Sequence, residues 1–147
     1  MAHHPPAHQP DEEIMLTIDI PGSIALTLHH LVLDYNGTLA EDGELLSGLD
    51  DRLKALHSLL KIHIITADTH GNVRQKLADL PVHLKILGPD QQDEQKAQFV
   101  KELGAQTVAA MGNGRNDVKM LAAAGLGVGI LQREGCAAAV LTAARIV

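Results

Sequence analysis

Short apolar runs rich in Val, Ile and Leu alternate with longer segments of helical periodicity from residue 30 onwards. The expected strands are 30–35, 61–67, 82–87, 107–112 and 125–130, with a strand-like stub at 145–147, and the expected helices are 49–60, 70–80, 93–103, 116–124 and 135–144. Strands that alternate with helices pair in parallel through right-handed crossovers. The pattern therefore predicts an α/β fold, a doubly wound parallel sheet with helices on both faces and its chemistry at the carboxyl ends of the strands.

The segment before the first of these strands has a different character. Residues 1–13 are rich in His and Pro and lack apolar periodicity, which is typical of a disordered lead-in. Two β-prone runs, 14–20 and 23–28, flank the turn dipeptide Pro21-Gly22 and predict an N-terminal β-hairpin. A chain of 147 residues has the length of one ordinary domain, so we expect a single domain over 14–147.

Composition narrows the classes of function. The formal net charge is −6 with a pI near 5.8, and the Lys and Arg residues are scattered, which argues against binding of nucleic acid. Cys136 is the single cysteine, which excludes an internal disulfide and a Cys-based zinc site. No apolar run approaches the roughly 20 residues that cross a bilayer. The sequence predicts a soluble, cytoplasmic protein without a membrane partner.

Polar residues collect where the predicted strands end. Asp34 ends the first parallel strand, Thr66 ends the second, and residues 112–117 (GNGRND) follow the fourth. Lys96 lies in the helix after the third strand. In a parallel sheet these endings converge on one crevice. A carboxylate can attack phosphorus and hold Mg²⁺, while a hydroxyl, backbone N–H groups and a lysine can hold phosphate oxygens, so the set predicts phosphoryl chemistry.

The order of these residues resembles the motifs of the haloacid dehalogenase (HAD) superfamily of phosphohydrolases. The stretch DYNGTL, residues 34–39, matches the first motif, Asp-x-Asp-Gly-Thr, except at Asn36. Thr66 matches the second motif and Lys96 the third. GNGRND matches the fourth, an acidic Gly-Asp-x-x-x-Asp loop, with an asparagine in the first acidic position. The resemblance spans nearly the whole ordered chain and implies a HAD-like Rossmannoid fold.

The resemblance also implies roles for individual residues. The implied catalytic residues are Asp34 as the nucleophile that forms an aspartyl-phosphate, Asn36, Thr66 and Lys96. The implied substrate-binding residues are Gly37, Thr38, Thr66, Ala67, Lys96 and Asn116. The implied ligands of a Mg²⁺ cofactor are Asp34, Asn36, Asn113 and Asp117, although Asp117 could instead fix the lysine. Lys101 or Lys119 could take the place of Lys96, and Asp68 is expected to cap the helix that follows it.

Two departures from the motifs bear on the activity. In the phosphatase branch the second aspartate of the first motif protonates the leaving group and activates water, and Asn36 can do neither. The backbone carbonyl of Asn36 can still bind Mg²⁺, whereas Asn113 replaces a carboxylate with a neutral amide and lowers the expected metal affinity. The phosphorylation domains of P-type ATPases share the first departure, and the chain resembles their small soluble relatives. We expect a slow Mg²⁺-dependent phosphohydrolase, with a non-turnover phosphoacceptor or Mg²⁺-binding regulatory module as the alternative.

The spacing of the motifs bears on the substrate. Only 27 residues (39–65) separate Thr38 from Thr66, and 29 (67–95) separate Thr66 from Lys96. The core itself uses these residues, and Asp42-Gly43 predicts no more than a small β-flap. The protein is therefore expected to be capless. Its open site would accept a phosphoprotein, or a phosphorylated small molecule enclosed by a neighbouring subunit of a homo-oligomer.

Overall fold

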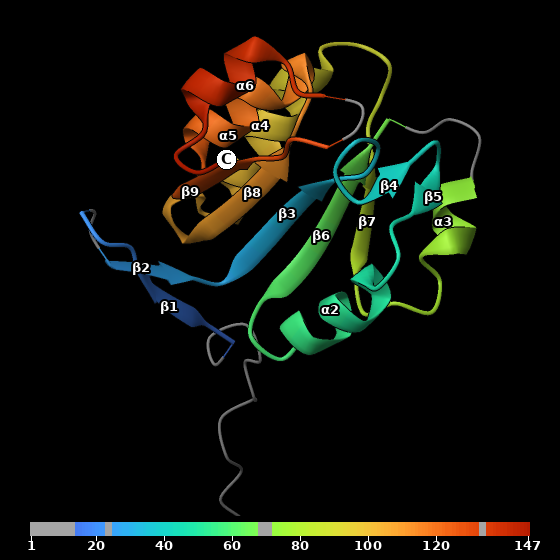
Figure 1. Cartoon of the computed structure of the whole chain (residues 1–147), viewed down its shortest axis with the longest axis horizontal. Helices are drawn as coiled ribbons and strands as arrows, with labels where there is room; N and C mark the ends of the chain where they lie inside the picture. Colours follow the sequence, from blue (N-terminus) through green and yellow to red (C-terminus); the bar gives the residue numbers. More distant parts are fainter. Residues whose placement is uncertain (1–13, 23–24, 68–71, 133–134) are drawn as a thin grey trace, which may run out of the picture.

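A five-stranded parallel sheet forms the centre of the protein in the computed structural model (Figure 1), which describes residues 14–22, 25–67, 72–132 and 135–147. The strands are β3 (His30–Asp34), β6 (Lys61–Thr66), β7 (His83–Ile86), β8 (Val108–Gly112) and β9 (Leu126–Gly129). Their order is β7-β6-β3-β8-β9, and every neighbouring pair is parallel. The earliest strand is central and later strands are added on either side of it, which confirms the predicted doubly wound sheet.

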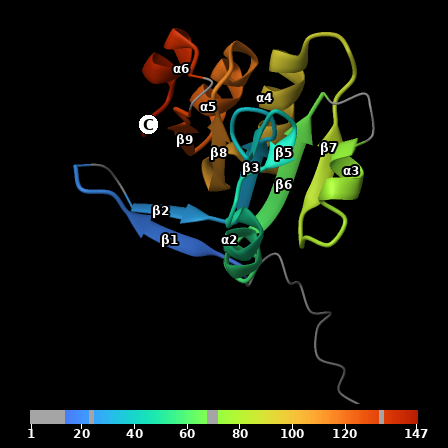
Figure 2. The ribbon, with the colours of Figure 1, turned by 45° about the vertical axis from the view of Figure 1, so that its right-hand side comes forward.

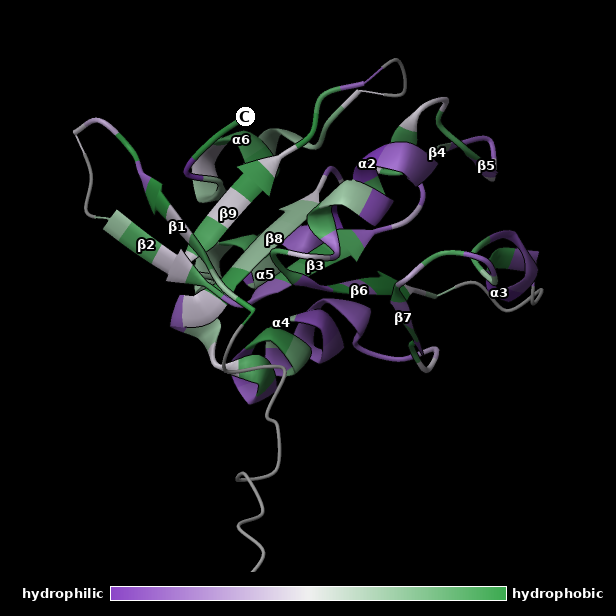
Figure 3. Ribbon diagram, turned by 90° about the horizontal axis from the view of Figure 1, so that it is seen from below, coloured by the Kyte–Doolittle hydropathy of each residue, from purple (hydrophilic) through white to green (hydrophobic). Residues whose placement is uncertain are grey.

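Helices cover both faces of this sheet. The helices are α2 (Leu49–Leu56), α3 (Asn72–Lys76), α4 (Gln92–Leu103), α5 (Val118–Ala123) and α6 (Ala138–Ala143). Figure 1 shows α2 and α3 on one side and the other three helices on the opposite side. Side chains alternate along a strand, so Leu31 and Leu33 of β3 join the core under α2 and α3, and Val32 joins the core under α4, α5 and α6. Figure 3 shows this layering as green strands β3 and β8 beside the largely purple α4.

Two small antiparallel hairpins flank the sheet. The predicted N-terminal hairpin is present as β1 (Leu16–Asp19) and β2 (Ala25–Leu28), and the β-flap as β4 (Ala40–Glu41) and β5 (Glu44–Leu45). Figures 1 and 2 show the first hairpin at the start of β3 and the flap near its carboxyl end. Asp42 and Gly43 turn the flap with φ values of 51° and 80°, which suit a tight hairpin turn. Within the described ranges, this flap and α2, and no cap domain, lie between Thr38 and Thr66.

Four helices, α2, α3, α5 and α6, are shorter than the sequence predicts. α2 ends at Leu56 rather than at residue 60, and α3 ends at Lys76 rather than at residue 80; the predicted start of α3, residues 70 and 71, lies outside the described residues. α6 begins at Ala138 rather than at 135, because Gly135 has a left-handed φ of 89° and Ala137 is extended (φ −63°, ψ 135°). The N–H of Ala137 donates to the carbonyl oxygen of Asn113 at 2.9 Å. Two 3₁₀ turns, η1 (Ala105–Thr107) and η2 (Arg115–Asp117), lie before β8 and α5, and η2 replaces the first turn expected for 116–124.

The end of the chain lies beside β9. Ile146 forms a parallel bridge with Val128, and the N–H of Arg145 donates to the carbonyl oxygen of Gly127 at 2.9 Å. No helix in the described ranges is long and apolar enough to cross a membrane. The predicted disordered lead-in, residues 1–13, lies outside the described residues.

Candidate active site

Asp34 is the last residue of the central strand, β3. The alternation that puts Val32 under α4, α5 and α6 also directs Asp34 to that face of the sheet. The residue is only 9% exposed. The carboxylate therefore lies at the carboxyl edge of the sheet, where parallel α/β folds bind their ligands.

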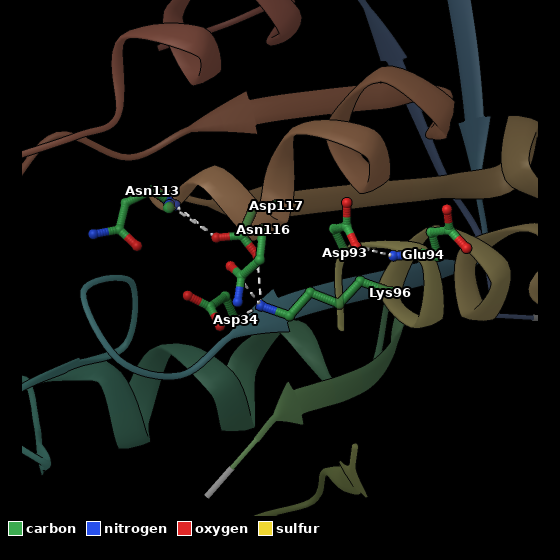
Figure 4. Close-up of polar contacts among 8 residues, drawn as sticks. Asp34, Asp93, Glu94, Lys96, Asn113, Asn116 and Asp117 are labelled. Atoms are coloured by element: carbon green, nitrogen blue, oxygen red, sulfur yellow. Dashed lines mark hydrogen bonds and ion pairs between the residues drawn. The ribbon is translucent and has the colours of Figure 1, made fainter. Parts of the chain in front are cut away.

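Lys96 extends from α4 to this carboxylate. Figure 4 shows its amine between the side chains of Asp34, Asn116 and Asp117. The Nζ donates to Asp34 Oδ1 at 3.0 Å, to Asp117 Oδ1 at 2.7 Å and to Asn116 Oδ1 at 3.3 Å. Lys96 is 2% exposed, and a buried ammonium is stable only when it is paired and hydrogen-bonded. The predicted nucleophile, lysine and fourth motif thus meet at one point.

Asp117 holds both the lysine and the loop between β8 and α5. It is fully buried, and its Oδ1 accepts from Lys96. Its Oδ2 accepts from the backbone N–H groups of Asn113 at 3.1 Å and Gly114 at 3.0 Å. A Cβ added to Gly112 would lie 2.5 Å from this carboxylate, so the loop can close around Asp117 only with glycine there.

Burial and the neighbouring charges shift the pKa values of Asp34 and Lys96. Burial and the neighbouring Asp117 raise the pKa of Asp34 from 3.8 to about 6, against the opposing effect of Lys96. Burial lowers the pKa of Lys96, but the two carboxylates outweigh it and hold that pKa above its usual value. The cluster therefore carries one firmly charged ammonium between two carboxylates, of which Asp34 takes up a proton as the pH falls towards 6.

The loop after β3 forms a tight turn on the backbone of Tyr35, whose carbonyl oxygen accepts the N–H of Ala40 at 3.0 Å. Gly37 has a φ of 78°, and a Cβ there would overlap the side-chain amide of Asn113. Thr38 is 5% exposed, and its Oγ1 has no hydrogen-bond partner among the residues that the structure describes. An unpaired buried hydroxyl costs about 1–3 kcal/mol, which a phosphate oxygen bound there would offset.

The oxygen atoms around Asp34 fit Mg²⁺. Asp117 is fully buried and accepts three hydrogen bonds from internal donors, whereas the side chain of Asp34 is 13% exposed, so Asp34 is the carboxylate of the pair that a metal can reach. The backbone carbonyl of Asn36 and the amide oxygen of Asn113 would add neutral ligands, and Mg²⁺ commonly combines one or two carboxylates with waters and phosphate oxygens. No group of three or more His, Cys, Asp or Glu placed to hold a metal occurs within the described ranges. An ion here would therefore depend on neutral oxygens and on the phosphate.

The other residues predicted to line the site lie around this cluster. Thr66 ends β6 beside Asp34's strand and is 3% exposed, and Ala67 follows it at intermediate burial. Asn36 is exposed on the loop after β3. In Figure 4 the side chain of Asn113 points away from the amine of Lys96. Asn113 is linked to the cluster by its backbone N–H, which donates to Asp117 Oδ2.

The alternative lysines do not reach the cluster. Lys101 is exposed on α4, and Lys119 pairs with Asp93 at 3.1 Å and with Glu94 at 3.3 Å. The predicted helix cap, Asp68, lies outside the described residues. Among the three lysines considered, Lys96 is therefore the one placed to touch a phosphoryl group on Asp34.

Sequence reasoning missed three residues that hold the surrounding loops. Gln132 donates from Nε2 to the carbonyl oxygen of Thr38 at 2.7 Å, and so fixes the loop after β3 from a position 94 residues away. Tyr35 Oη at 3.0 Å and Lys76 Nζ at 2.6 Å both donate to the carbonyl oxygen of Gly43 and tie the β-flap to the body of the protein. Gln132 and Lys76 lie outside the motifs, Tyr35 occupies only the variable position of the first one, and no periodicity indicates such contacts.

Replacing Lys96 by methionine tests the buried ion cluster. We expect the free energy of unfolding at pH 7 to fall by about 3–5 kcal/mol, because two buried carboxylates lose their shared cation. The pKa of Asp34 would rise further above its ordinary value, so folding would favour the protonated carboxyl even more. The loss of stability should therefore be largest above pH 6 and shrink as the pH falls through and below it, as measured by urea unfolding at several pH values.

Lys101→Met is the matched control, since it removes an exposed lysine from the same helix. It should change stability by no more than about 0.5 kcal/mol at any pH. Equal losses in the two variants, or a Lys96→Met loss that grows as the pH falls, would contradict the account of the cluster.

The comparisons with known proteins bear on the fold. No protein-family model matches the chain. It is 44% identical over 39 residues to an uncharacterized protein of Methanocaldococcus jannaschii, a match that covers 26% of this chain and 89% of that protein. The solved structures that it resembles include HAD-family proteins, and the chain has the HAD-like Rossmannoid fold.

Three of these structures show the extent of the similarity. One is a Streptomyces avermitilis protein provisionally assigned to the HAD family hydrolases (25% identity, 82% of this chain and 75% of that one, TM-score 0.66). Another is the cobalt-bound deoxy-D-mannose-octulosonate 8-phosphate phosphatase of Haemophilus influenzae (19% identity, 82% and 77%, TM-score 0.64). The third is the 3-deoxy-D-manno-octulosonate 8-phosphate phosphatase of Moraxella catarrhalis in complex with magnesium, phosphate and KDO (21% identity, 81% and 75%, TM-score 0.61).

Proposed function

We propose that this chain is a Mg²⁺-dependent phosphohydrolase that acts through an aspartyl-phosphate on Asp34. The observation that carries the proposal is the buried contact of Lys96 with both Asp34 and Asp117 at the carboxyl edge of the sheet. A buried carboxylate beside a fixed cation, below a loop with an unpaired threonine hydroxyl, suits a covalent phosphoryl intermediate. The phosphatases among the similar structures support the same class of reaction.

The proposed reaction has two displacements at phosphorus. In the first, a carboxylate oxygen of Asp34 attacks the phosphorus, and the bond to the leaving-group oxygen breaks; the leaving group departs with the electron pair and takes a proton from solvent. In the second, water attacks the phosphorus, the bond to Asp34 breaks, and inorganic phosphate, a proton and the free carboxylate result. Lys96, Thr38 and Thr66 would hold the phosphoryl oxygens, with Ala67, Gly37 and Asn116 beside them.

Magnesium would be held by Asp34, the backbone carbonyl of Asn36 and Asn113, and it would neutralise charge on the transferring group. The magnesium and cobalt in two of the similar structures support a divalent ion as the cofactor. Asp117, although predicted as a ligand, would act mainly by fixing Lys96, because both of its oxygens already accept hydrogen bonds.

Asn36 favours a second candidate function. An amide neither donates nor accepts a proton usefully near pH 7, so the chain would form the aspartyl-phosphate more readily than it clears it. That behaviour would resemble the phosphorylation domain of a P-type ATPase, or a phosphoacceptor module that responds to a single phosphorylation. The number of phosphates released per protein molecule separates the two: many favour the enzyme, and one favours the module.

A panel of phosphate compounds with and without Mg²⁺ tests the proposed function. The panel should include acyl, aryl and alkyl phosphates, a phosphopeptide, and sugar phosphates. Acyl and aryl phosphates should be hydrolysed fastest, because their leaving groups need little help from an acid, and chelation of Mg²⁺ should remove at least nine-tenths of the rate. A rate that is indifferent to both the leaving group and the metal would contradict the proposal.

A further inference from the structure

A hollow lies next to the Lys96 cluster, on the side of the loop between β8 and α5. Its volume is about 420 Å³, within the range of sites for small ligands. It is lined by Pro89, Gln91, Gln92, Asp93, Arg115 and Asn116. Asn116 belongs to both places, because its Oδ1 accepts from Lys96 at 3.3 Å. A molecule whose phosphate lies at Asp34 could therefore extend into the hollow.

The charge in this hollow comes from Arg115. Its side chain is exposed, and no ion pair or hydrogen bond of its guanidinium occurs among the described residues. Asp93, the one acidic residue of the lining, is already paired with Lys119 at 3.1 Å. The remaining polar lining consists of neutral amides. An unpaired guanidinium with amide donors around it is suited to a planar or tetrahedral anion, which Arg binds through two parallel hydrogen bonds.

We propose that this hollow binds a second anionic group of the substrate, with Arg115 as the residue that recognises it. The substrate class would be phosphomonoesters whose leaving group carries a carboxylate or another phosphate. The inference rests on the proposed function, because it places the phosphate at Asp34. It adds Arg115, the exposed cationic residue of the GNGRND loop, as a specificity residue.

Two non-hydrolysable probes test the hollow without any turnover. Calorimetry would compare benzylphosphonate with 4-carboxybenzylphosphonate in the full chain, in Arg115→Gln and in Arg52→Gln, which removes an exposed arginine from α2. We expect the carboxylated probe to bind about fivefold more tightly than the plain one in the full chain and in Arg52→Gln, as for one exposed charge pair. The preference should disappear in Arg115→Gln.

The outcomes separate the two proposals. A preference that survives in Arg115→Gln, no preference in the full chain, or no binding of either probe would overturn the inference about the hollow. Asp34-dependent phosphate release from acyl phosphates would still support the proposed function in each of these cases. Loss of the preference in Arg115→Gln without any phosphate release would support the hollow and count against the enzyme. A third probe with a phosphonate in place of the carboxylate shows which anion Arg115 prefers.

Discussion

Replacing Asp34 by asparagine abolishes phosphate release from acetyl phosphate and from p-nitrophenyl phosphate, with an expected loss of about 10³-fold or more. The amide of the variant cannot form the covalent intermediate. The substitution also removes the carboxylate of the cluster that Mg²⁺ can reach. The protein should remain folded, because the change removes one of two buried negative charges, Asp34 and Asp117, that repel each other. Steady-state phosphate release, together with a thermal melt, measures both effects.

The control for this variant is Asp90→Asn, which makes the same chemical change at an exposed residue before α4. It should keep the rate of the unaltered chain to within about twofold. Turnover that persists in a folded Asp34→Asn protein would show that phosphoryl transfer, if present, takes place elsewhere.

Replacing Asn36 by aspartate should accelerate hydrolysis of alkyl phosphates by about 10²–10⁴-fold, the usual contribution of one general acid or base. Asn36 is exposed on the loop after β3, so a carboxylate there carries little burial cost. Its proximity to Asp34 would raise its pKa and keep part of it protonated for the leaving group. Acyl phosphates should gain less in the first step, because their leaving groups need no proton.

Asn72→Asp provides the matched control, since it adds a carboxylate at an exposed position at the start of α3. The test compares kcat for alkyl and acyl phosphates in the three proteins. Asn72→Asp should leave both rates unchanged. If Asn36→Asp gives no acceleration, or if the two variants accelerate both substrates equally, then the missing acid is not what limits turnover.

The pattern of strands and helices was enough to predict the doubly wound sheet, because short apolar runs alternate with segments of helical periodicity along the chain. Helix ends were predicted less well. The alanine-rich stretch from 135 has helical periodicity, but the backbone of Ala137 is used to hold the loop that carries Asn113. Periodicity reports which residues face a core and cannot report such long-range backbone contacts.

The candidate site followed from residue types at strand ends for the same reason. Asp34 and Asp117 follow neighbouring parallel strands, so their proximity could be predicted from the topology. The choice of Lys96 over Lys101 and Lys119 depended on the resemblance, and its contacts decide it. The contacts of Gln132 and Lys76 could not be predicted, since each acts through a backbone carbonyl on a distant loop. The lack of a hydrogen-bond partner for the Thr38 hydroxyl among the described residues likewise depends on how the loop folds and could not be predicted from the sequence.

The most direct test of the account is acid-quenched intact-mass spectrometry after brief exposure to acetyl phosphate and Mg²⁺, with released phosphate measured in the same samples. The account predicts a single added phosphoryl group on the unaltered chain, none on Asp34→Asn, and phosphate release that exceeds one equivalent with time. An adduct that remains in Asp34→Asn, or continuous phosphate release by that variant, would contradict it.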